Sequence, residues 1–113
     1  MMAKSITRIY SRYSRDAAAL LGALIREARN ERKLTAQELA DRAGISRSLL
    51  QRIEKCNLKC ELGVVFEVAT IVGIKLFEAD ESALTKYLSQ TREKLALLPK
   101  SVRKNSKTVY DDF

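Results

Sequence analysis

A single glycine between two short helical patterns constrains the fold of this chain more than any other feature. Thr35 is followed three residues later by Glu38, a capping box in which each side chain satisfies a backbone amide at a helix start. Gly44 follows where a left-handed backbone is commonly needed to end a helix, and Ser46 then offers an N-cap for the next one. The pattern predicts two short helices joined by a tight turn, the second ending near Lys55.

Apolar residues at steps of three and four predict the remaining helices. Residues 14–32 fit a first helix, residues 61–72 a fourth helix that ends before Gly73, and a fifth begins at Asp80 and stops before Pro99. The expected inner face of the first helix consists of Ala17, Leu20, Leu21, Leu24, Ile25 and Ala28. Because no stretch alternates apolar and polar residues, we expect an all-α protein of five helices.

The two short helices divide into a core side and an exposed side. Ala40 is small enough to let them approach each other, and the apolar residues that lock the pair to the body are Leu39, Ile45, Leu50 and Ile53. The face left exposed consists of Arg47, Ser48, Leu49, Gln51 and Arg52. Such a face fits the major groove of DNA, where Arg donates two hydrogen bonds to guanine and an apolar side chain contacts a thymine methyl. For Leu49 packing inside is the alternative, since apolar residues of short helices usually do so.

The turns around this pair offer contacts to a phosphate backbone. The start of the first short helix presents amides together with Thr35 and Gln37, and Ser46 stands at the start of the second. Asn57 and Lys59, in the loop that follows, are placed to clamp the backbone from the other end. We expect these five residues to bind DNA phosphates.

Charge supports a polyanionic partner. The 113 residues include 21 Lys and Arg against 14 Asp and Glu, a net charge of +7. Double-stranded DNA is the leading candidate and an acidic membrane the weaker one. Residues 42–59 are the most basic part of the expected body, with five Lys and Arg against Glu54 alone. A solvated surface is the alternative for this segment, but its charges coincide with the turn geometry.

Composition also argues against a metal site, a membrane span and catalysis. Cys56 and Cys60 are the only cysteines and the chain has no histidine, so one chain lacks the four ligands of a tetrahedral zinc site. The longest apolar run, residues 17–25, is too short to cross a bilayer. There is no glycine-rich phosphate loop and no carboxylate pair in an evident pocket. We expect no cofactor, no enzymatic activity, and a cytoplasmic, nucleoid-associated protein.

The length allows one compact domain with tails. We expect a basic N-terminal arm at residues 1–13, a DNA-binding domain at 14–79, a C-terminal helix at 80–98 and a flexible tail at 99–113. The arm either adds phosphate or minor-groove contacts or serves solubility. The tail is either idle or docks an aromatic anchor, Tyr110 or Phe113, into a partner.

Residues 34–55, LTAQELADRAGISRSLLQRIEK, resemble the helix-turn-helix of the Cro and phage-repressor class, also called the xenobiotic-response-element family of bacterial regulators. Ala40, Gly44 and the four apolar core residues stand at the spacings of that motif. The resemblance implies a lambda-repressor-like fold with Arg47 and Ser48 at base-reading positions and Arg52 one turn further along.

The same resemblance implies an ion pair between Arg29 and Glu54 that braces the recognition helix. Two positions depart from the family pattern. Many relatives have Gln where this chain has Ala36, a DNA contact that Gln37 is the candidate to replace. Many also have Gly directly after the recognition helix, where this chain has Cys56. We expect Asn57 to take the turn instead, because Asn tolerates a positive φ better than Cys.

The C-terminal half narrows the resemblance. ELGVVFEVATIVGIKLF, residues 61–77, together with LALLPKSVRKNSKTVYDDF at residues 95–113, is similar to HipB-like antitoxins encoded beside HipA-type serine/threonine kinase toxins. This similarity implies a homodimer that binds an inverted-repeat operator, represses its own operon and restrains a HipA-like kinase. A repressor of the same fold without a toxin, and an interaction module that has lost DNA binding, are the alternatives.

The apolar residues of the expected fifth helix admit three roles. They belong to the core, to a dimer seam or to a kinase-binding surface, and they are Leu84, Tyr87, Leu88, Leu95 and Leu98.

Overall fold

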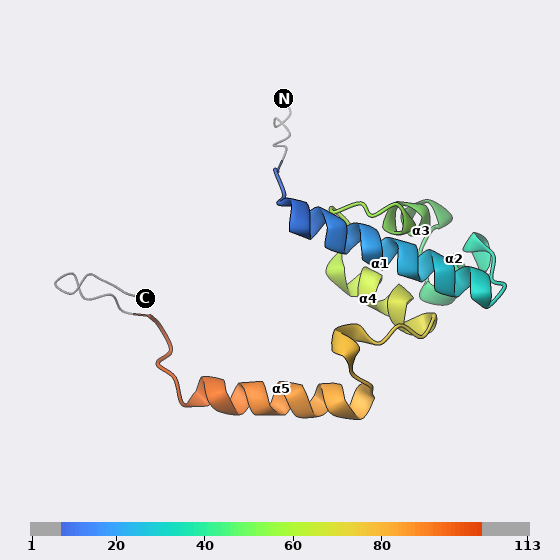
Figure 1. The fold of residues 1–113 in the computed structure, drawn as a ribbon. Helices are drawn as coiled ribbons and strands as arrows, with labels where there is room; N and C mark the ends of the chain where they lie inside the picture. Colours follow the sequence, from blue (N-terminus) through green and yellow to red (C-terminus); the bar gives the residue numbers. More distant parts are fainter. Residues whose placement is uncertain (1–7, 103–113) are drawn as a thin grey trace. The chain divides into compact units, whose positions relative to one another are not determined.

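The computed structural model describes residues 8–102 (Figure 1). These residues form α1 (Arg12–Glu31), α2 (Ala36–Ala43), α3 (Arg47–Glu54), α4 (Leu62–Ile71), the short 3-10 turn η1 (Leu76–Glu78) and α5 (Glu81–Ala96). The described part of the chain contains five α-helices and no strand, which confirms the all-α prediction. The chain divides into two compact units, the first ending at Glu78 and the second beginning at Ala79.

Side-chain caps fix where the helices begin. The capping box is confirmed, because Thr35 Oγ1 accepts from the amide of Glu38 at 3.0 Å while the Glu38 carboxylate accepts from the amide of Thr35 at 2.8 Å. Ser46 and Asp80 cap α3 and α5 as predicted. Helix α1 begins at Arg12, earlier than predicted, because Ser11 caps it by accepting from the amide of Ser14.

The ends of α1 to α4 share one backbone pattern. After each helix a residue with positive φ donates its amide to the carbonyl three residues back, and the next amide reaches the carbonyl five residues back. This is the Schellman motif, which satisfies carbonyls that would otherwise be unpaired. The four residues at the left-handed position are Lys33 at φ 58°, Gly44 at 70°, Cys56 at 60° and Gly73 at 86°.

The prediction that Asn57 takes the turn after α3 is wrong. Cys56 holds the left-handed position of the Schellman motif that ends α3. The Cys56 amide donates to the Ile53 carbonyl, and the Asn57 amide donates to the Arg52 carbonyl. The Asn57 side chain instead accepts from the amide of Lys59 at 2.8 Å and shapes the following turn. A non-glycine residue at positive φ costs about 1–2 kcal/mol, so the end of α3 carries local backbone strain.

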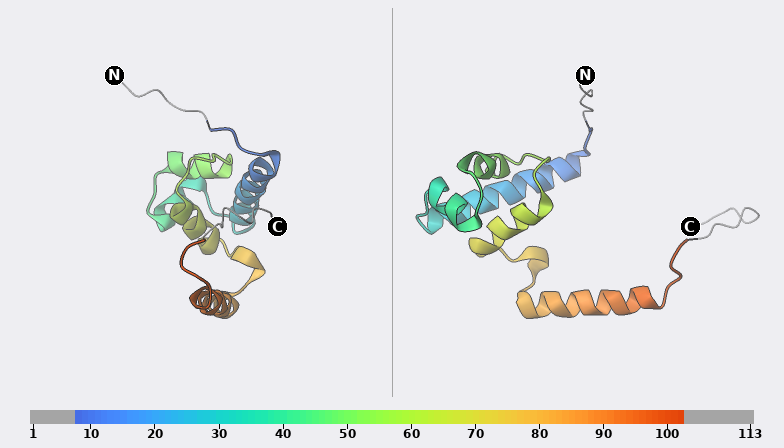
Figure 2. Two further views of the ribbon diagram at one scale, coloured as in Figure 1. Left: turned by 90° about the vertical axis from the view of Figure 1, so that its left-hand side faces the viewer. Right: turned by 180° about the vertical axis from the view of Figure 1, so that it is seen from behind.

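The core of the first unit lies among α1, α2, α3 and α4, which surround it in both views of Figure 2. Leu39, Leu50 and Ile53 are buried as predicted, and Ile45 packs against them from the corner between α2 and α3. Ala40 is fully buried, consistent with its predicted role at the crossing of the two helices. The remaining buried core residues are Ile25, Val68, Ala69 and Val72.

The predicted inner face of α1 is partly wrong. Leu21, Ile25 and Ala28 do face the core, but Ala17 and Leu24 are exposed and Leu20 is 59% exposed. The six apolar residues span a wider arc than one helix face can bury against α3 and α4. The helix turns Gly22 inward instead.

Gly22 allows α1 and the end of α3 to approach each other closely. A Cβ atom at this position would lie 2.7 Å from the carbonyl oxygen of Ile53 and 2.9 Å from that of Glu54. Both atoms belong to the backbone at the end of α3, so a side chain at position 22 requires α3 to move. Gly22 therefore sets the depth at which α3 docks on α1.

The second unit contains α5, and none of the residues of this helix is buried. Within the second unit, Leu84, Tyr87, Leu88, Leu95 and Leu98 therefore form no buried core. Their side chains are between 38% and 62% exposed.

Candidate nucleic-acid interface

The outer face of α3 presents four polar side chains to solvent. Arg47 is the first residue of the helix, and Ser48, Gln51 and Arg52 follow it, all of them exposed. Residues four apart lie on the same side of a helix, so Arg47 stands above Gln51 and Ser48 above Arg52. At base edges in the major groove, arginine donates hydrogen bonds and glutamine both donates and accepts them. The structure thus places these four predicted base-reading residues on one continuous surface.

Leu49 departs from the predicted base-reading set. It is half-buried and packs against the core cluster, so the structure supports the inward alternative. The reason lies in the helical spacing: Leu49 falls four residues after Ile45 and four before Ile53, both of which contact the core. Its position at the edge of the buried side explains why the sequence alone left both roles open.

An ion pair holds the end of α3 to α1. Arg29 Nε and Nη2 donate to the two carboxylate oxygens of Glu54 at 2.7 and 3.0 Å, a bidentate pair. The third bond runs from Arg29 Nη1 to the carbonyl of Leu34 at 3.0 Å. Since Leu34 directly precedes the cap of α2, one guanidinium connects α1, the start of α2 and the end of α3.

This pair is well shielded, with exposed side-chain fractions of 12% for Arg29 and 7% for Glu54. The hydrogen bonding that Arg29 donates to the Glu54 carboxylate raises the pKa of Arg29 above its ordinary value, and desolvation opposes that rise. Arg29 therefore remains charged throughout the pH range in which proteins are folded. Removing one partner of such a pair leaves an uncompensated charge and costs several kcal/mol.

A cleft of about 430 Å³ opens beside the outer face of α3. Three elements build it, since α1, the first turn of α2 and α3 with the residue that follows it all contribute. The residues that line it are Arg26, Arg29, Thr35, Ala36, Arg47, Gln51, Glu54 and Lys55. The charges of Arg29 and Glu54 cancel, so Arg26, Arg47 and Lys55 give the cleft its positive charge.

Arg26 and Lys55 were not among the predicted site residues. The signal for Arg26 was available, because it stands three residues before Arg29 and therefore shares its helix face. Lys55 follows the last residue of α3 and lines the same cleft from the other side. Both are exposed cations next to the predicted base-reading surface, which is where phosphate contacts position a DNA-binding protein.

The predicted phosphate ligands around α2 have unequal surroundings. Thr35 lines the cleft, but its hydroxyl oxygen already accepts the cap bond from Glu38. The Gln37 side chain donates to the Asp41 carboxylate at 2.8 Å and does not line the cleft. The structure therefore pairs Gln37 within α2 rather than bringing it to the position of the contact missing at Ala36. What α2 offers to a phosphate here is chiefly its N-terminal amides.

The remaining predicted phosphate ligands lie outside the cleft. Ser46 is exposed, and its side chain accepts from the amide of Leu49 as the cap of α3. Asn57 and Lys59 are exposed in the loop after α3, where the bond from the Lys59 amide to Asn57 fixes the turn. This exposure leaves the Lys59 side chain accessible to a phosphate.

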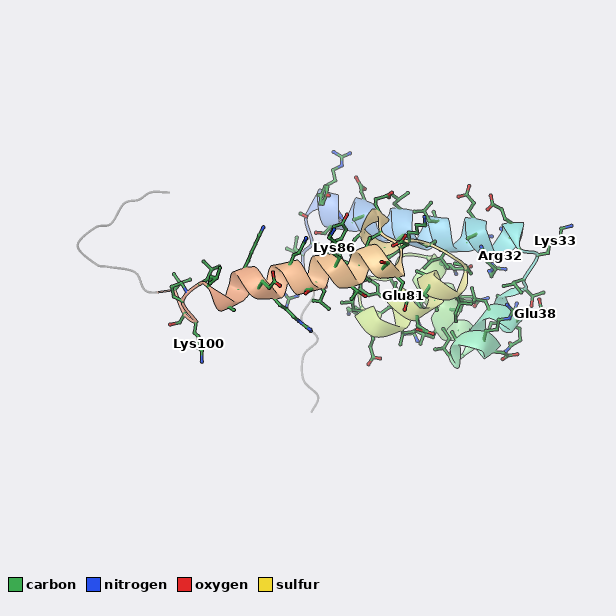
Figure 3. The ribbon with its side chains drawn as sticks, turned by 90° about the horizontal axis from the view of Figure 1, so that it is seen from below. Arg32, Lys33, Glu38, Glu81, Lys86 and Lys100 are labelled. Carbon is green, nitrogen blue, oxygen red and sulfur yellow. The ribbon has the colours of Figure 1, made fainter. Side chains whose placement is uncertain are left out.

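Not every cation of the first unit belongs to this surface. Arg32, which Figure 3 labels at the end of α1 beside Lys33, donates to the carbonyl of Val72 at the end of α4. The guanidinium lies against Gly73, where a side chain would collide with it. Arg32 therefore ties α1 to α4. Tyr110 and Phe113, the predicted partner anchors, lie outside the described residues.

A short, capped helix pair with a basic outer face defines the first unit as a DNA-binding module of the helix-turn-helix class. The helix-turn-helix domain family matches the chain over residues 20–76, half of its length, and the chain belongs to this family. The matched segment begins at Leu20 within α1 and includes all of α2, α3 and α4. Comparisons with curated proteins and with solved structures gave no significant match.

Two features are absent from residues 8–102. No helix in this range has the length and apolar character needed to cross a membrane. The same range contains no group of three or more cysteine, aspartate and glutamate side chains arranged to hold a metal ion. Cys56 and Cys60 are both free thiols.

Proposed function

We propose that the protein is a sequence-specific transcriptional repressor that reads DNA with the outer face of α3. One observation carries this proposal: the base-reading candidates Arg47 and Gln51 share a cleft with the cations Arg26 and Lys55. Base-edge contacts and phosphate contacts would then come from one surface, as specific binding requires. The Arg29–Glu54 pair fixes the angle at which α3 is presented.

The roles of these residues differ. Arg47 stands at the first position of α3, and the N-terminal residues of a recognition helix are those that reach base edges. Ser48, Gln51 and Arg52 extend the same face. Arg26, Lys55 and Lys59 contribute charge to phosphates, which brings the protein to DNA and sets its register without reading sequence.

The operator follows from the symmetry of a dimer. A homodimer presents two α3 helices related by a two-fold axis, so its site is an inverted repeat whose half-sites lie about 34 Å apart, one helical turn. Binding there blocks transcription of the adjoining operon, and we propose that the protein represses its own.

The finer identity that we propose is a HipB-like antitoxin. Its support is the similarity of residues 61–77 and 95–113 to such antitoxins, which implies a HipA-like serine/threonine kinase as partner. The neighbouring reading frame tests this directly: it should encode such a kinase. The kinase should copurify with the full chain, and removal of residues 100–113 shows whether the tail is needed. A neighbouring frame unrelated to kinases would favour a repressor that acts alone.

A gel-shift titration tests DNA binding itself. Labelled DNA from upstream of the protein's own reading frame should shift at low salt, and the affinity should fall by about 10³ or more between 50 and 200 mM salt for six or more phosphate contacts. Arg26→Ala should weaken binding and lower the salt slope by about one. If no salt-sensitive shift occurs, the chain is an interaction module rather than a repressor.

A further inference from the structure

One side of α5 is apolar along the whole helix. Leu84 is 38% exposed, Tyr87 51%, Leu88 49% and Leu95 62%. With Thr91, these residues fall within an arc of about 100° on the helix surface, the width of a face that normally packs against another element. We call this set the α5 stripe. Leu98, 59% exposed, extends it just beyond the helix end.

A helix of this kind needs a partner. Helix α5 has 16 residues, none of them buried, and isolated helices near this length are marginal in water. Its N-cap from Asp80 contributes only about 1 kcal/mol. Burial of the stripe is therefore the main stabilisation available to the helix.

The charges beside the stripe indicate which partner fits. The beginning of α5 carries Asp80 and Glu81, and its end carries Arg92, Lys94 and, beyond the helix, Lys100. Figure 3 shows Glu81 and Lys100 toward opposite ends of this segment. Helical spacing places Arg92 and Lys94 on the two flanks of the stripe.

Two charged residues of α5 do not follow this division: Lys86 is a cation in the first half of the helix, and Glu93 is an anion near its basic end. Helical spacing places both on the far side of α5, away from a seam. The flanks of the stripe are thus acidic at one end and basic at the other, which complements a second copy running in the opposite direction. A parallel pair would bring like charges together at both ends.

We infer that α5 pairs with α5 of a second copy in antiparallel orientation through the stripe. This pairing places the acidic first turn of each helix beside the basic last turn of the other. It buries the same residues on both copies, so the pair has two-fold symmetry. The inference deepens the proposed function, because it rests on the homodimer proposed above and names the surface that forms it.

Sedimentation equilibrium of the full chain without DNA tests the seam. The wild-type chain should be dimeric at micromolar concentration, and Leu88→Glu should weaken the dimer by about a hundredfold or more, because each seam would contain unpaired carboxylates. The neighbouring substitution Ser89→Glu is the matched control, since it adds the same charge on the opposite side of the helix and should leave the dimer intact. A monomeric wild-type chain, as expected if the stripe folds onto its own first unit, overturns the inference. So does a dimer that resists Leu88→Glu.

Cysteine cross-linking tests the orientation. In a background of Cys56→Ser and Cys60→Ser, Leu88→Cys at the middle of α5 should cross-link two copies under mild oxidation. Leu95→Cys should not, because an antiparallel pair centred near Leu88 separates the two copies of residue 95 by about 20 Å. Cross-linking of Leu95→Cys as efficient as that of Leu88→Cys would show a parallel pair and overturn the orientation.

Binding to DNA separates this inference from the proposed function. Leu88→Glu should bind a single half-site like the wild-type chain and lose the tighter binding to an inverted repeat. Arg47→Ala should bind both DNAs more weakly and lose the preference at one base pair of each half-site, while remaining dimeric. If Leu88→Glu binds the inverted repeat as tightly as wild type, the seam is elsewhere even though the chain binds DNA.

Discussion

Replacement of Gly22 by Ala tests the packing that positions the recognition helix. The added Cβ atom would lie 2.7 Å from the carbonyl oxygen of Ile53 and 2.9 Å from that of Glu54, whereas ordinary contact begins near 3.4 Å. Because both neighbours are backbone atoms, no side chain can rotate away. The end of α3 must retreat by about 0.7 Å to reach ordinary contact, and the Glu54 carboxylate moves with it away from Arg29.

The expected cost follows from two opposing effects. Overpacking costs about 1–3 kcal/mol, and two backbone contacts under 3.0 Å put this site at about 2–3 kcal/mol, while Ala stabilises a helix interior relative to Gly by about 1 kcal/mol. We expect Gly22→Ala to lower the free energy of unfolding by about 1–2 kcal/mol. Gly63 in the first turns of α4 provides the matched control, since no atom lies within 4 Å of a Cβ built there. Gly63→Ala should raise the free energy of unfolding by about 0.5 kcal/mol.

Urea denaturation followed by circular dichroism measures both changes. The two substitutions should change the free energy of unfolding in opposite directions, although each replaces a helical glycine by alanine. The Gly22 variant should also bind DNA more weakly, because its α3 is displaced. If Gly22→Ala stabilises the protein as much as Gly63→Ala does, the close approach of α1 and α3 is not what fixes the recognition helix.

Three further substitutions follow from the same structure. Cys56→Gly should raise the free energy of unfolding by about 1 kcal/mol in urea denaturation, since glycine takes the left-handed backbone without strain; equal stability of the two chains would contradict this origin of strain. Arg29→Met should lower the free energy of unfolding by about 3 kcal/mol, because it leaves the buried Glu54 carboxylate unpaired. The double variant Arg29→Met with Glu54→Leu should recover part of this loss, because that carboxylate is gone. Equal stability of the single and double variants would rule out the unpaired charge as the cause. Lys59→Ala should weaken binding to all DNA sequences alike in a gel shift, and a selective loss would refute its phosphate role.

Local sequence patterns predicted most of the fold because they depend on neighbours in the chain. The caps at Thr35, Ser46 and Asp80 involve bonds over three residues, and each formed where expected. The same holds for the left-handed turn at Gly44. Such signals need no knowledge of the tertiary packing.

The errors arose where tertiary contacts decide. Leu20 belongs to the apolar pattern of α1, but the approach at Gly22 turned a different face toward α3. Leu49 stands at the border between the core side and the outer side of α3, and only packing against its neighbours resolves its position. Cys56 accepts the turn because the end of α3 fixes the register, which outweighs the preference of Asn57.

The residues of the cleft could also be predicted only where they belong to one helix. Arg47 and Gln51 were predictable from the exposed face of one helix. The contribution of Arg26 could not be predicted in this way, because the packing of α1 against α3 brings it to the same cleft as Lys55 and no local sequence pattern connects the two residues.

In the proposed mechanism, the outer face of α3 reads base sequence while the surrounding cations bind phosphates. The most direct measurement is the affinity of the wild-type chain, Arg47→Ala and Arg26→Ala for the operator and for operators with single base-pair changes, by fluorescence anisotropy. Arg47→Ala should lose about 1–3 kcal/mol on the operator and become indifferent to one base pair of each half-site. Arg26→Ala should weaken every DNA by a similar factor and keep the wild-type base preferences. An Arg47→Ala chain with the full preferences of the wild type would contradict the account.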